Sequence, residues 1–371
     1  MAAKNVLGII ISNAYDEVIP EITSQRTMGS VPFAGRYRLI DFQLSNMVNA
    51  GIPQVGVLTN SNYRSLMDHI GNGKAWDLAR KRDGLTVLPP FNQPETGIYK
   101  GKLDALYGSI GYISDSGKDY VLVTDCNIVC DIDYEEFINY HIERDAEITL
   151  AYARGVKTSI AGATEYEMSS YGGRINEIRF ADGYREDMSN SLKMMVINRA
   201  LLERLLHEGN LKRISTLEQI LSENCSNLRI CGYRHNGYVK VIEDLKSYYE
   251  ANLDLLKPEV RKALFSADKP IYTKTRDKVP AVYGISSSVS NSLIADGCRI
   301  DGEVENSILF RGVTVSKGAK VKNAIIMQDT FISENAEVEY VITDKDVSIG
   351  ARKRLCGAEN YPVYIGKGIN I

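Results

Sequence analysis

The chain has 371 residues, of which 44% are apolar and 25% are charged, and its formal net charge is −3. This composition is typical of a globular protein with a sizeable core, and its slightly acidic balance provides no overall positive field for nucleic acid. The apolar run at residues 6–11 is too short for a secretion signal, and no later run approaches the ~20 residues of a membrane helix. We therefore expect a cytoplasmic protein that binds neither membranes nor nucleic acid.

The six cysteines and four histidines form no recognisable disulfide or metal pattern. No two cysteines have C-x-x-C spacing, and the histidines are far apart in the sequence. In a reducing compartment, such cysteines are expected to remain free thiols. We expect neither a disulfide framework nor a zinc site.

The N-terminal two thirds of the chain alternate short apolar runs with stretches of helical pattern. Buried strands are expected at residues 6–11, 55–59, 120–124, 148–152 and 193–197, and helices at residues 41–50 and 104–113. Continuous apolar strands separated by helices predict an α/β fold with a mostly parallel sheet and flanking helices. Ligands of such sheets bind outside the carboxyl ends of the strands. Residues 215–218 predict a capping box that opens a further helix to about residue 223.

A charged segment with three prolines, residues 257–283, is predicted to be a linker. It would separate an α/β domain, residues 1–256, from a C-terminal domain, residues 284–371. Proline-rich and charged composition is typical of the boundary between domains.

The C-terminal domain is built from four copies of one short apolar unit. The copies begin at residues 292, 307, 324 and 341, so their spacings are 15, 17 and 17 residues. A period near 17 residues corresponds to about three short β-edges, which make one triangular coil. One coil cannot bury its apolar face, but stacked coils share a continuous core. The repeat predicts a left-handed parallel β-helix, with residues 361–371 as a last edge.

Several long motifs resemble the bacterial glucose-1-phosphate adenylyltransferases. The segment V-P-F-A-G-R-Y-R-L-I-D-F-Q-L-S-N, residues 31–46, closely resembles the family's V-P-F-G-G-K-Y-R-L-I-D-F-x-L-S-N. Further segments that look like this family are residues 68–80, 86–90, 250–255 and 305–312. The resemblance covers nearly the whole chain. It implies a nucleotidyltransferase-type α/β domain before a left-handed β-helix, and synthesis of ADP-glucose and pyrophosphate from ATP and glucose 1-phosphate for glycogen.

The loop that would hold the phosphates departs from this family. Nucleotidyl transfer needs backbone N–H groups and cations around the phosphates, and carboxylates that hold Mg²⁺. Active members resemble A-G-G-x-G-x-R-L after the first strand, whereas this chain has no glycine there. Polar and acidic residues replace that loop: Ser12, Asn13, Asp16 and Glu17. The family's R-A-K-P-A-V-P-F then reads R-T-M-G-S-V-P-F from Arg26, so Met28 replaces a lysine.

The two positions that would hold Mg²⁺ have also changed. Asn127 aligns with the aspartate of the family's L-x-x-G-D-H-I-Y, and Val241 aligns with the aspartate of Y-W-x-D-V-G. Valine cannot bind Mg²⁺. Two alternatives stay open, because Asp125 could slide into the first position and Glu243 or Asp244 could compensate for the second.

The substrate-binding motifs are altered as well. Lys193 replaces the glycine of the family's S-M-G-x-Y, and no E-K-P motif follows residues 174–180. The segment at the family's R-G-T-A-D-A contributes Gly101, Lys102 and Asp104. Scaffold motifs are therefore retained while charge-handling positions are lost.

This pattern resembles the noncatalytic, regulatory subunits of the family. The resemblance implies that this chain itself needs no cofactor, and that a catalytic partner subunit binds Mg²⁺ and ATP. It also implies a hetero-oligomer, most simply a tetramer, with that partner, although a homo-oligomer of this chain alone is open too. An active adenylyltransferase with substituted metal and phosphate ligands is the alternative. An acyltransferase would need a histidine on the β-helix, but all four histidines precede residue 236.

Basic residues on the C-terminal domain are candidates for effector binding. Arg352, Lys353 and Arg354 form a triplet that could bind a phosphorylated effector. A second basic triplet lies at residues 80–82, and a site at the domain boundary near Arg36 or Arg38 is also open. The plain alternative for each triplet is a solvated charged face.

Overall fold

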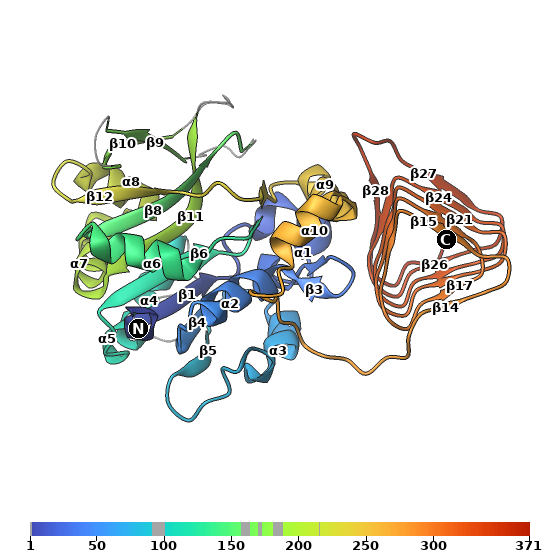
Figure 1. Ribbon diagram of the computed structural model, residues 1–371, viewed down its shortest axis with the longest axis horizontal. Coiled ribbons are helices and arrows are strands. Elements are labelled where there is room, and N and C mark those ends of the chain that lie inside the picture. The colour runs from blue at the N-terminus through green and yellow to red at the C-terminus, as the bar shows by residue number, and fades with distance from the viewer. Residues whose placement is uncertain (1, 91–100, 157–163, 170–172, 181–187, 215) are drawn as a thin grey trace.

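The computed structural model describes residues 2–90, 101–156, 164–169, 173–180, 188–214 and 216–371. The sheet of the N-terminal domain contains β1 (Val6–Ile11), β4 (Gln54–Leu58), β5 (Gly84–Leu88), β6 (Tyr120–Asp125), β8 (Ile148–Arg154), β9 (Thr164–Met168), β10 (Ile175–Phe180), β11 (Ser189–Asn198) and β12 (Ile230–Arg234). The strand order is β10-β9-β11-β6-β1-β4-β5, and β8 lies between β11 and β12 (Figure 1). β1 runs parallel to β4 and β6, whereas β11 is antiparallel to β6 and β8. The predicted mostly parallel α/β sheet is confirmed.

Helices cover both faces of this sheet. The described part of the chain contains the helices α1 (Pro20–Thr23), α2 (Leu39–Asn49), α3 (Arg64–Ile70), α4 (Lys102–Gly108), α5 (Ile110–Asp115), α6 (Tyr134–Glu143), α7 (Arg199–Lys212), α8 (Leu217–Asn224), α9 (Leu245–Leu253) and α10 (Pro258–Leu264), of which α9 and α10 lie between the sheet and the β-helix (Figure 1). Alternate residues of β1 point into hydrophobic cores on opposite faces of the sheet. Ile10 packs with α2 and α6, whereas Ile9 packs with α4, α5 and α7. Such alternation is expected for a strand buried on both faces.

The helix predicted at residues 104–113 is wrong in one respect, because it is two helices. α4 ends at Gly108, and the backbone N–H of Ser109 turns back to the carbonyl oxygen of Leu106 at 3.1 Å. Glycine is a weak helix former, so the chain bends here before α5 begins. The bend lets both short helices pack against α7.

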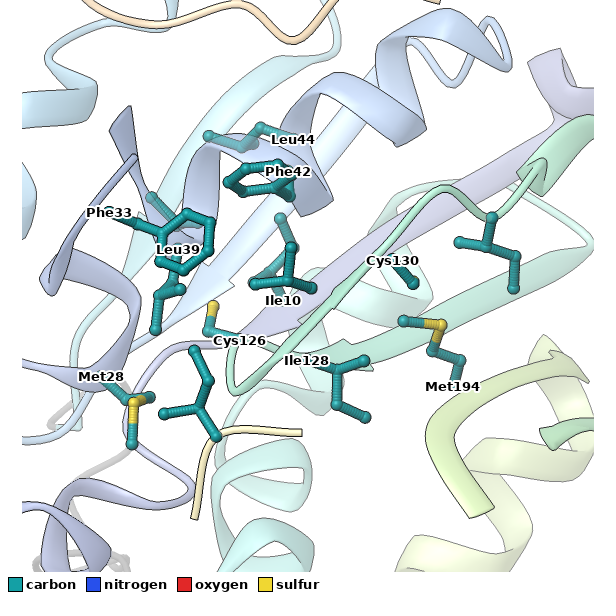
Figure 2. Close-up of a cluster of buried hydrophobic side chains, with 14 of the residues drawn as sticks. Ile10, Met28, Phe33, Leu39, Phe42, Leu44, Cys126, Ile128, Cys130 and Met194 are labelled. Atoms are coloured by element: carbon teal, nitrogen blue, oxygen red, sulfur yellow. The ribbon is translucent and has the colours of Figure 1, made fainter. Parts of the chain in front are cut away.

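The family-like motif at residues 31–46 forms scaffold. Its short hairpin, β2 (Pro32–Phe33) and β3 (Tyr37–Arg38), leads directly into α2. Phe33 and Phe42 meet edge to face with ring centroids 5.5 Å apart, and both are fully buried (Figure 2). Leu39 and Leu44 from α2 complete this part of the core. The apolar residues of the retained motif therefore stabilise the fold and do not contribute to a reaction.

The C-terminal domain is a left-handed β-helix of three parallel sheets, seen nearly down its axis in Figure 1. One sheet contains β14 (Val282–Tyr283), β17 (Arg299–Ile300), β20 (Thr314–Val315), β23 (Phe331–Ile332) and β26 (Ser348–Ile349). The second contains β15 (Ser288–Ser290), β18 (Glu303–Glu305), β21 (Lys320–Lys322), β24 (Glu337–Glu339) and β27 (Arg354–Cys356). The third contains β16 (Leu293–Ile294), β19 (Ile308–Leu309), β22 (Ile325–Ile326), β25 (Val341–Thr343) and β28 (Val363–Ile365).

The repeat predicted from the sequence is confirmed at the level of single residues. Val304, Val321 and Val338 pair in register in successive coils, and all three are buried. Each coil therefore contributes the same inward position to one continuous core. The segment at residues 361–371 supplies β28, as expected for a last edge.

The domains share apolar core and polar contacts. Ile308, Ile325 and Ile342 of the β-helix belong to the same buried cluster as α2. The Tyr249 hydroxyl donates a hydrogen bond to the Asn323 carbonyl oxygen at 2.6 Å. Within the predicted linker, residues 258–264 form α10, and residues 265–281 contain neither helix nor strand before the β-helix begins.

Candidate functional site

A cleft of about 630 Å³ lies where β1, β4 and β6 end. This is the edge at which ligands of mostly parallel sheets bind. The structure brings eight of the sequence-predicted residues together in its lining: Asn13, Asp16, Glu17, Gly101, Lys102, Asn127, Lys193 and Val241. Positions far apart in the sequence thus converge on one site of ordinary ligand-binding size.

Four other predicted residues lie outside the lining of this cleft. Ser12 is buried and its hydroxyl donates to the Leu58 carbonyl oxygen at 2.7 Å. Met28 is buried in the apolar core (Figure 2), and Asp104 lies in the first turn of α4. Arg26 points to the domain boundary, where it pairs with Asp344 at 2.6 Å.

In the loop after β1, the carboxylate of Asp16 accepts hydrogen bonds that a bound anion could otherwise accept. Asp16 Oδ1 accepts a hydrogen bond from the backbone N–H of Met28 at 2.6 Å, and Asp16 Oδ2 accepts one from the Asn13 amide. Burial raises the pKa of Asp16 to about 6. A phosphate brought within about 4 Å of an ionised Asp16 would be opposed by on the order of 1–4 kcal/mol. The loop is therefore poorly suited to hold a triphosphate.

The same loop is tied to the end of β4. Asn13 Oδ1 accepts a hydrogen bond from the backbone N–H of Asn60 at 2.8 Å, and its amide also donates to the Ser61 carbonyl oxygen at 3.1 Å. These bonds join the loop that follows β1 to the loop that follows β4, and both loops line the cleft. A glycine-rich loop could not make them, because glycine has no side chain.

Lys102 lies at the floor of the cleft among acidic groups. Its ammonium pairs with Asp125, donates to the Tyr15 hydroxyl at 3.0 Å and lies 3.6 Å from Glu218. Burial alone would lower the pKa of Lys102, but Asp125, Tyr15 and Glu218 raise it well above its ordinary value. Lys102 is therefore charged, and its charge is already balanced within the chain.

Lys193 occupies a strained position in a bulge of β11. The register of β11 against β8 shifts between Ser191 and Met195, and Lys193 has φ +54°. The family's glycine at this position is consistent with that left-handed backbone, which costs an L-residue about 1–2 kcal/mol. The Lys193 ammonium bonds Thr164 at 2.7 Å and Glu218 at 3.4 Å. Although burial opposes ionisation, Lys102 and Lys193 lower the pKa of Glu218 to about 2.

The two aligned metal positions do meet in space. β13 (Val239–Val241) pairs with β7 (Ile128–Cys130), so that Val241 lies opposite Ile128. The Asn127 amide donates to the Ile242 carbonyl oxygen at 3.3 Å, and Asn127 Oδ1 has no donor among the described residues. An amide oxygen and a valine are not the carboxylates that Mg²⁺ prefers, so these residues do not fit the ion. Across the described part of the chain, no group of three or more His, Cys, Asp or Glu side chains could hold a metal.

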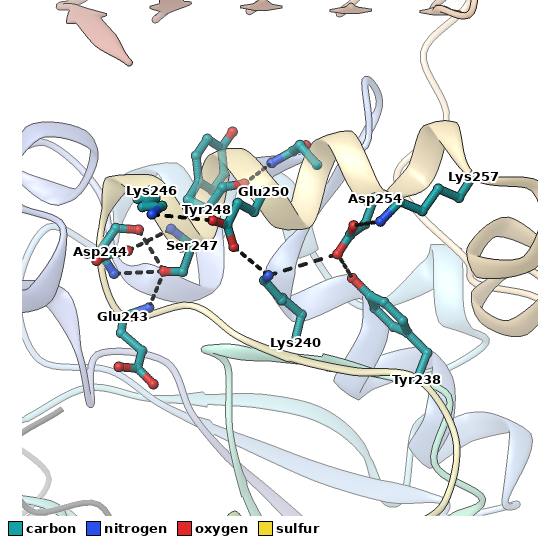
Figure 3. Close-up of polar contacts among 11 residues, drawn as sticks. Tyr238, Lys240, Glu243, Asp244, Lys246, Ser247, Tyr248, Glu250, Asp254 and Lys257 are labelled. Atoms are coloured by element: carbon teal, nitrogen blue, oxygen red, sulfur yellow. Dashed lines mark hydrogen bonds and ion pairs between the residues drawn. The ribbon is translucent and has the colours of Figure 1, made fainter. Parts of the chain in front are cut away.

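Two of the three residues that were candidates to compensate, Asp125 and Asp244, are engaged elsewhere. Asp125 pairs with Lys102, and Asp244 is the N-cap of α9, where it accepts from Ser247 N at 2.6 Å (Figure 3). Glu243 borders a second cavity of about 1330 Å³ between α9 and the β-helix. In that cavity the Lys240 ammonium pairs with Glu250 at 2.7 Å.

Sequence reasoning missed the acidic partners of the two lysines. Glu218 was assigned to a capping box with Ser215, but Ser215 lies outside the described residues and the N-cap of α8 is Thr216. Glu218 instead points at Lys102 and Lys193. The available signal was indirect: two lysines predicted in a cleft need counter-charges, since buried lysines are rarely unpaired.

The predicted effector triplet lies apart from the cleft. Arg352, Lys353 and Arg354 are exposed near the start of β27, and Arg354 pairs with Glu337 of the preceding coil at 3.3 Å. At the domain boundary, by contrast, two basic groups are buried, Arg26 and Arg38, and a third, Lys345, is partly buried beside them. Arg26 Nη1 has no hydrogen-bond partner among the described residues.

An α/β sheet with a cleft at its strand ends, followed by a β-helix, is the architecture of nucleotidyltransferase-type proteins that have a hexapeptide-type C-terminal domain. Residues 17–166 match the nucleotidyl transferase family, and residues 279–359 match the GlmU-like C-terminal hexapeptide family. No helix in the described residues has the length and apolarity needed to cross a membrane.

Full-length relatives specify the family further. The glycogen biosynthesis protein GlgD of Bacillus subtilis (strain 168) is 38% identical over 369 residues, which cover 100% of this chain and 98% of that protein. GlgD of Geobacillus stearothermophilus is 35% identical over 86% of this chain and 83% of its own length. A glucose-1-phosphate adenylyltransferase of Pseudothermotoga lettingae is 34% identical over 86% of this chain and 76% of its length. The chain belongs to the glucose-1-phosphate adenylyltransferase (ADP-glucose pyrophosphorylase) family of glycogen biosynthesis.

Proposed function

We propose that this chain is a noncatalytic, regulatory subunit of glucose-1-phosphate adenylyltransferase. The observation that carries the proposal is the charge balance of the cleft. Asp16 occupies a backbone donor of the phosphate loop, and Lys102 and Lys193 are paired with carboxylates of the chain itself. A triphosphate needs unpaired donors and cations, and among the described residues of the cleft both lysines are already paired.

The active alternative lacks a comparable observation in its favour. Asn127 and Val241 meet at the expected place but do not supply carboxylates, and Asp125 is held by Lys102. The similarity to proteins named glycogen biosynthesis protein GlgD over nearly the full length supports a role in the same pathway without requiring turnover. The partner we propose is a catalytic member of the same family, in a hetero-oligomer that is most simply a tetramer.

We expect the purified chain to form no ADP-glucose from ATP, glucose 1-phosphate and Mg²⁺. Ordinary enzymes turn over at ~1–10³ s⁻¹, and the rate here should fall at least ~10³-fold below that range. The measurement is release of pyrophosphate or ADP-glucose, first by this chain alone and then by its assembly with a catalytic homologue. Turnover in the ordinary range by the chain alone would overturn the proposal. The assembly should differ from the catalytic subunit alone in rate or in effector response.

Regulation by an anion at the domain boundary is favoured by an excess of buried positive charge. Burial, together with Arg38 and Arg26, lowers the pKa of Lys345 to about 7. Burial also lowers the pKa of Arg38 to about 10, although Asp41 opposes the shift. Asp344 balances only part of this charge, because its single carboxylate pairs with Arg26 while Lys345 faces both Arg26 and Arg38. A phosphate-type anion would supply the missing negative charge.

We expect inorganic phosphate to stabilise this chain against heat through Lys345. Because the folded-state pKa of Lys345 is near 7, the stabilisation should be larger at pH 6 than at pH 8. Lys345→Met should reduce the rise in Tm at saturating phosphate by at least half. The triple variant Arg352→Ala/Lys353→Ala/Arg354→Ala tests the other candidate site and should keep the full response. Loss of the response in the triple variant alone would move the effector site to that triplet.

A further inference from the structure

One sheet of the β-helix presents rows of charged side chains to solvent. This sheet contains β15, β18, β21, β24 and β27, and it lies on a side of the β-helix turned away from the α/β domain (Figure 1). In β18, β21 and β24 the middle valine is buried and both of its neighbours carry charge. Because successive side chains of a strand point to opposite faces, these charged residues project outward. Together with one arginine of β27 they form the charged face: Glu303, Glu305, Lys320, Lys322, Glu337, Glu339 and Arg354.

The sign of the charge on this face alternates from one coil to the next. The strand register places Glu303 beside Lys320, and Lys320 beside Glu337. Glu337 in turn lies beside Arg354 of the following coil. The rows are therefore acidic in β18, basic in β21, acidic in β24 and basic in β27.

These charges pair within the chain and still remain open to solvent. Lys322 Nζ lies 2.9 Å from a carboxylate oxygen of Glu305, yet the two side chains are 44% and 45% exposed. A carboxylate has several lone pairs and an ammonium has several N–H donors, so one contact leaves capacity for a further partner. Unlike the buried lysines of the cleft, these groups can take a second counter-charge while every existing pair stays intact.

The alternation makes the charged face complementary to itself. When a second copy is laid face to face, with a two-fold axis parallel to the strands and between β21 and β24, β18 lies opposite β27 of the other copy and β21 lies opposite β24. The opposed residues then have unlike charges: Glu303 with Arg354, Lys320 with Glu337, and Lys322 with Glu339. Glu305 is the exception, since it lies opposite the uncharged Cys356. A two-fold axis along the β-helix would instead set each row opposite itself, and repulsion between like charges disfavours that arrangement.

We propose that two copies of this chain associate through the charged face, across a two-fold axis parallel to its strands. The strands of this face are three residues long, so the contact is small, and pairs between exposed charges are individually weak. The contact is therefore a transient one that depends on salt. It goes beyond the proposed function, because it joins two noncatalytic subunits to each other and uses no residue of the cleft.

Sedimentation equilibrium of the purified full-length chain measures this association, in a reducing buffer because Cys356 is an exposed thiol. We expect a monomer–dimer equilibrium with a Kd on the order of 10–100 μM at low salt. Raising NaCl from about 25 mM to about 500 mM should weaken it at least tenfold, because salt screens exposed charges. Lys320→Glu should also weaken it at least tenfold, since the two-fold axis creates two contacts between like charges. Arg299→Glu is the matched control, because it reverses a 71% exposed charge on β17 of a neighbouring sheet and should leave the Kd unchanged.

An exchange of charge between two copies separates docking from loss of fold. Glu337→Lys alone should weaken association as Lys320→Glu does, because two basic rows then meet. An equimolar mixture of the two variants should associate within about threefold of the unsubstituted chain, since every acidic residue at position 320 or 337 again lies opposite a lysine. If the alternating charges served only to stabilise the β-helix, mixing would restore nothing.

Three results would overturn the inference. They are a chain that stays monomeric at low salt and at concentrations tenfold above the expected Kd, an association that neither variant weakens, and a mixture of the variants that stays monomeric. None of these results measures turnover. The proposed function fails separately, if the chain alone forms ADP-glucose.

Discussion

Replacement of Asp344 by alanine is expected to lower the free energy of unfolding by about 3–5 kcal/mol, because it leaves a buried arginine without its counter-ion. The Arg26 and Asp344 side chains are 5% and 4% exposed, and their nitrogen and oxygen atoms are 2.6 Å apart. Asp344 also accepts from the Tyr364 hydroxyl at 2.9 Å. Its loss would expose Arg26 to unopposed repulsion from Lys345 and Arg38 at the boundary between the domains.

Urea denaturation monitored by circular dichroism measures this effect. Asp346→Asn is a matched control, because it removes the same charge from an exposed position two residues away and asparagine tolerates the positive φ of 60° there. It should change stability by no more than about 0.5 kcal/mol. The double variant Arg26→Met/Asp344→Leu should be more stable than Asp344→Ala, since it removes both members of the buried pair and leaves no arginine there without its counter-ion. Equal stability of Asp344→Ala and the control would contradict the interpretation.

Replacement of Lys102 by methionine is expected to cost about 3–5 kcal/mol at pH 8, because two buried carboxylates lose their shared cation. Asp125 is 2% exposed and depends on Lys102 alone for an ion pair among the described residues, whereas Glu218 retains Lys193. Methionine has a similar length and flexibility, so the change removes charge with little change in packing.

The pH dependence of this variant follows from Asp125. Burial already raises the pKa of Asp125 in the folded chain, and loss of Lys102 would raise it further. A raised folded-state pKa means that the folded chain favours the protonated, neutral carboxyl. The free energy of unfolding therefore falls as the pH rises through that pKa and the carboxyl becomes charged. The gap between the unsubstituted chain and Lys102→Met should therefore be larger at pH 8 than at pH 5. Lys212→Met, which removes a surface pair with Glu208, should show no such trend.

Local features of the fold were readable from the sequence for a physical reason. Each strand of the α/β sheet is a continuous apolar run because both of its faces are buried, as at residues 6–11. The stop of α4 at Gly108 was missed, since periodicity alone does not show where a helix bends. The β-helix was the clearest feature, because each coil needs apolar residues at the same inward positions. The length of one coil is therefore visible as the period of the sequence repeat.

The candidate site was readable only where alignment to a family motif fixed the position. Asn127 and Val241 were placed together by resemblance, and the pairing of β7 with β13 does bring them together. Ser12, Met28 and Asp104 were included because they stand in the altered motifs, yet they lie outside the cleft lining. Motif position shows that a residue has changed, but not which way its side chain points.

The two kinds of domain, their order along the chain, and the loss of the glycine-rich loop with its cation can all be read from the amino-acid sequence. The ion pairs cannot: that Lys102 is neutralised by Asp125 and Glu218, and Arg26 by Asp344, becomes visible once the chain is folded. The physical reason is that hydrophobic period and turn chemistry act over neighbouring residues and are visible in any window of the chain. An ion pair between residues that are distant in the sequence depends on where the complete fold places each side chain. No pattern within a short stretch of sequence indicates it.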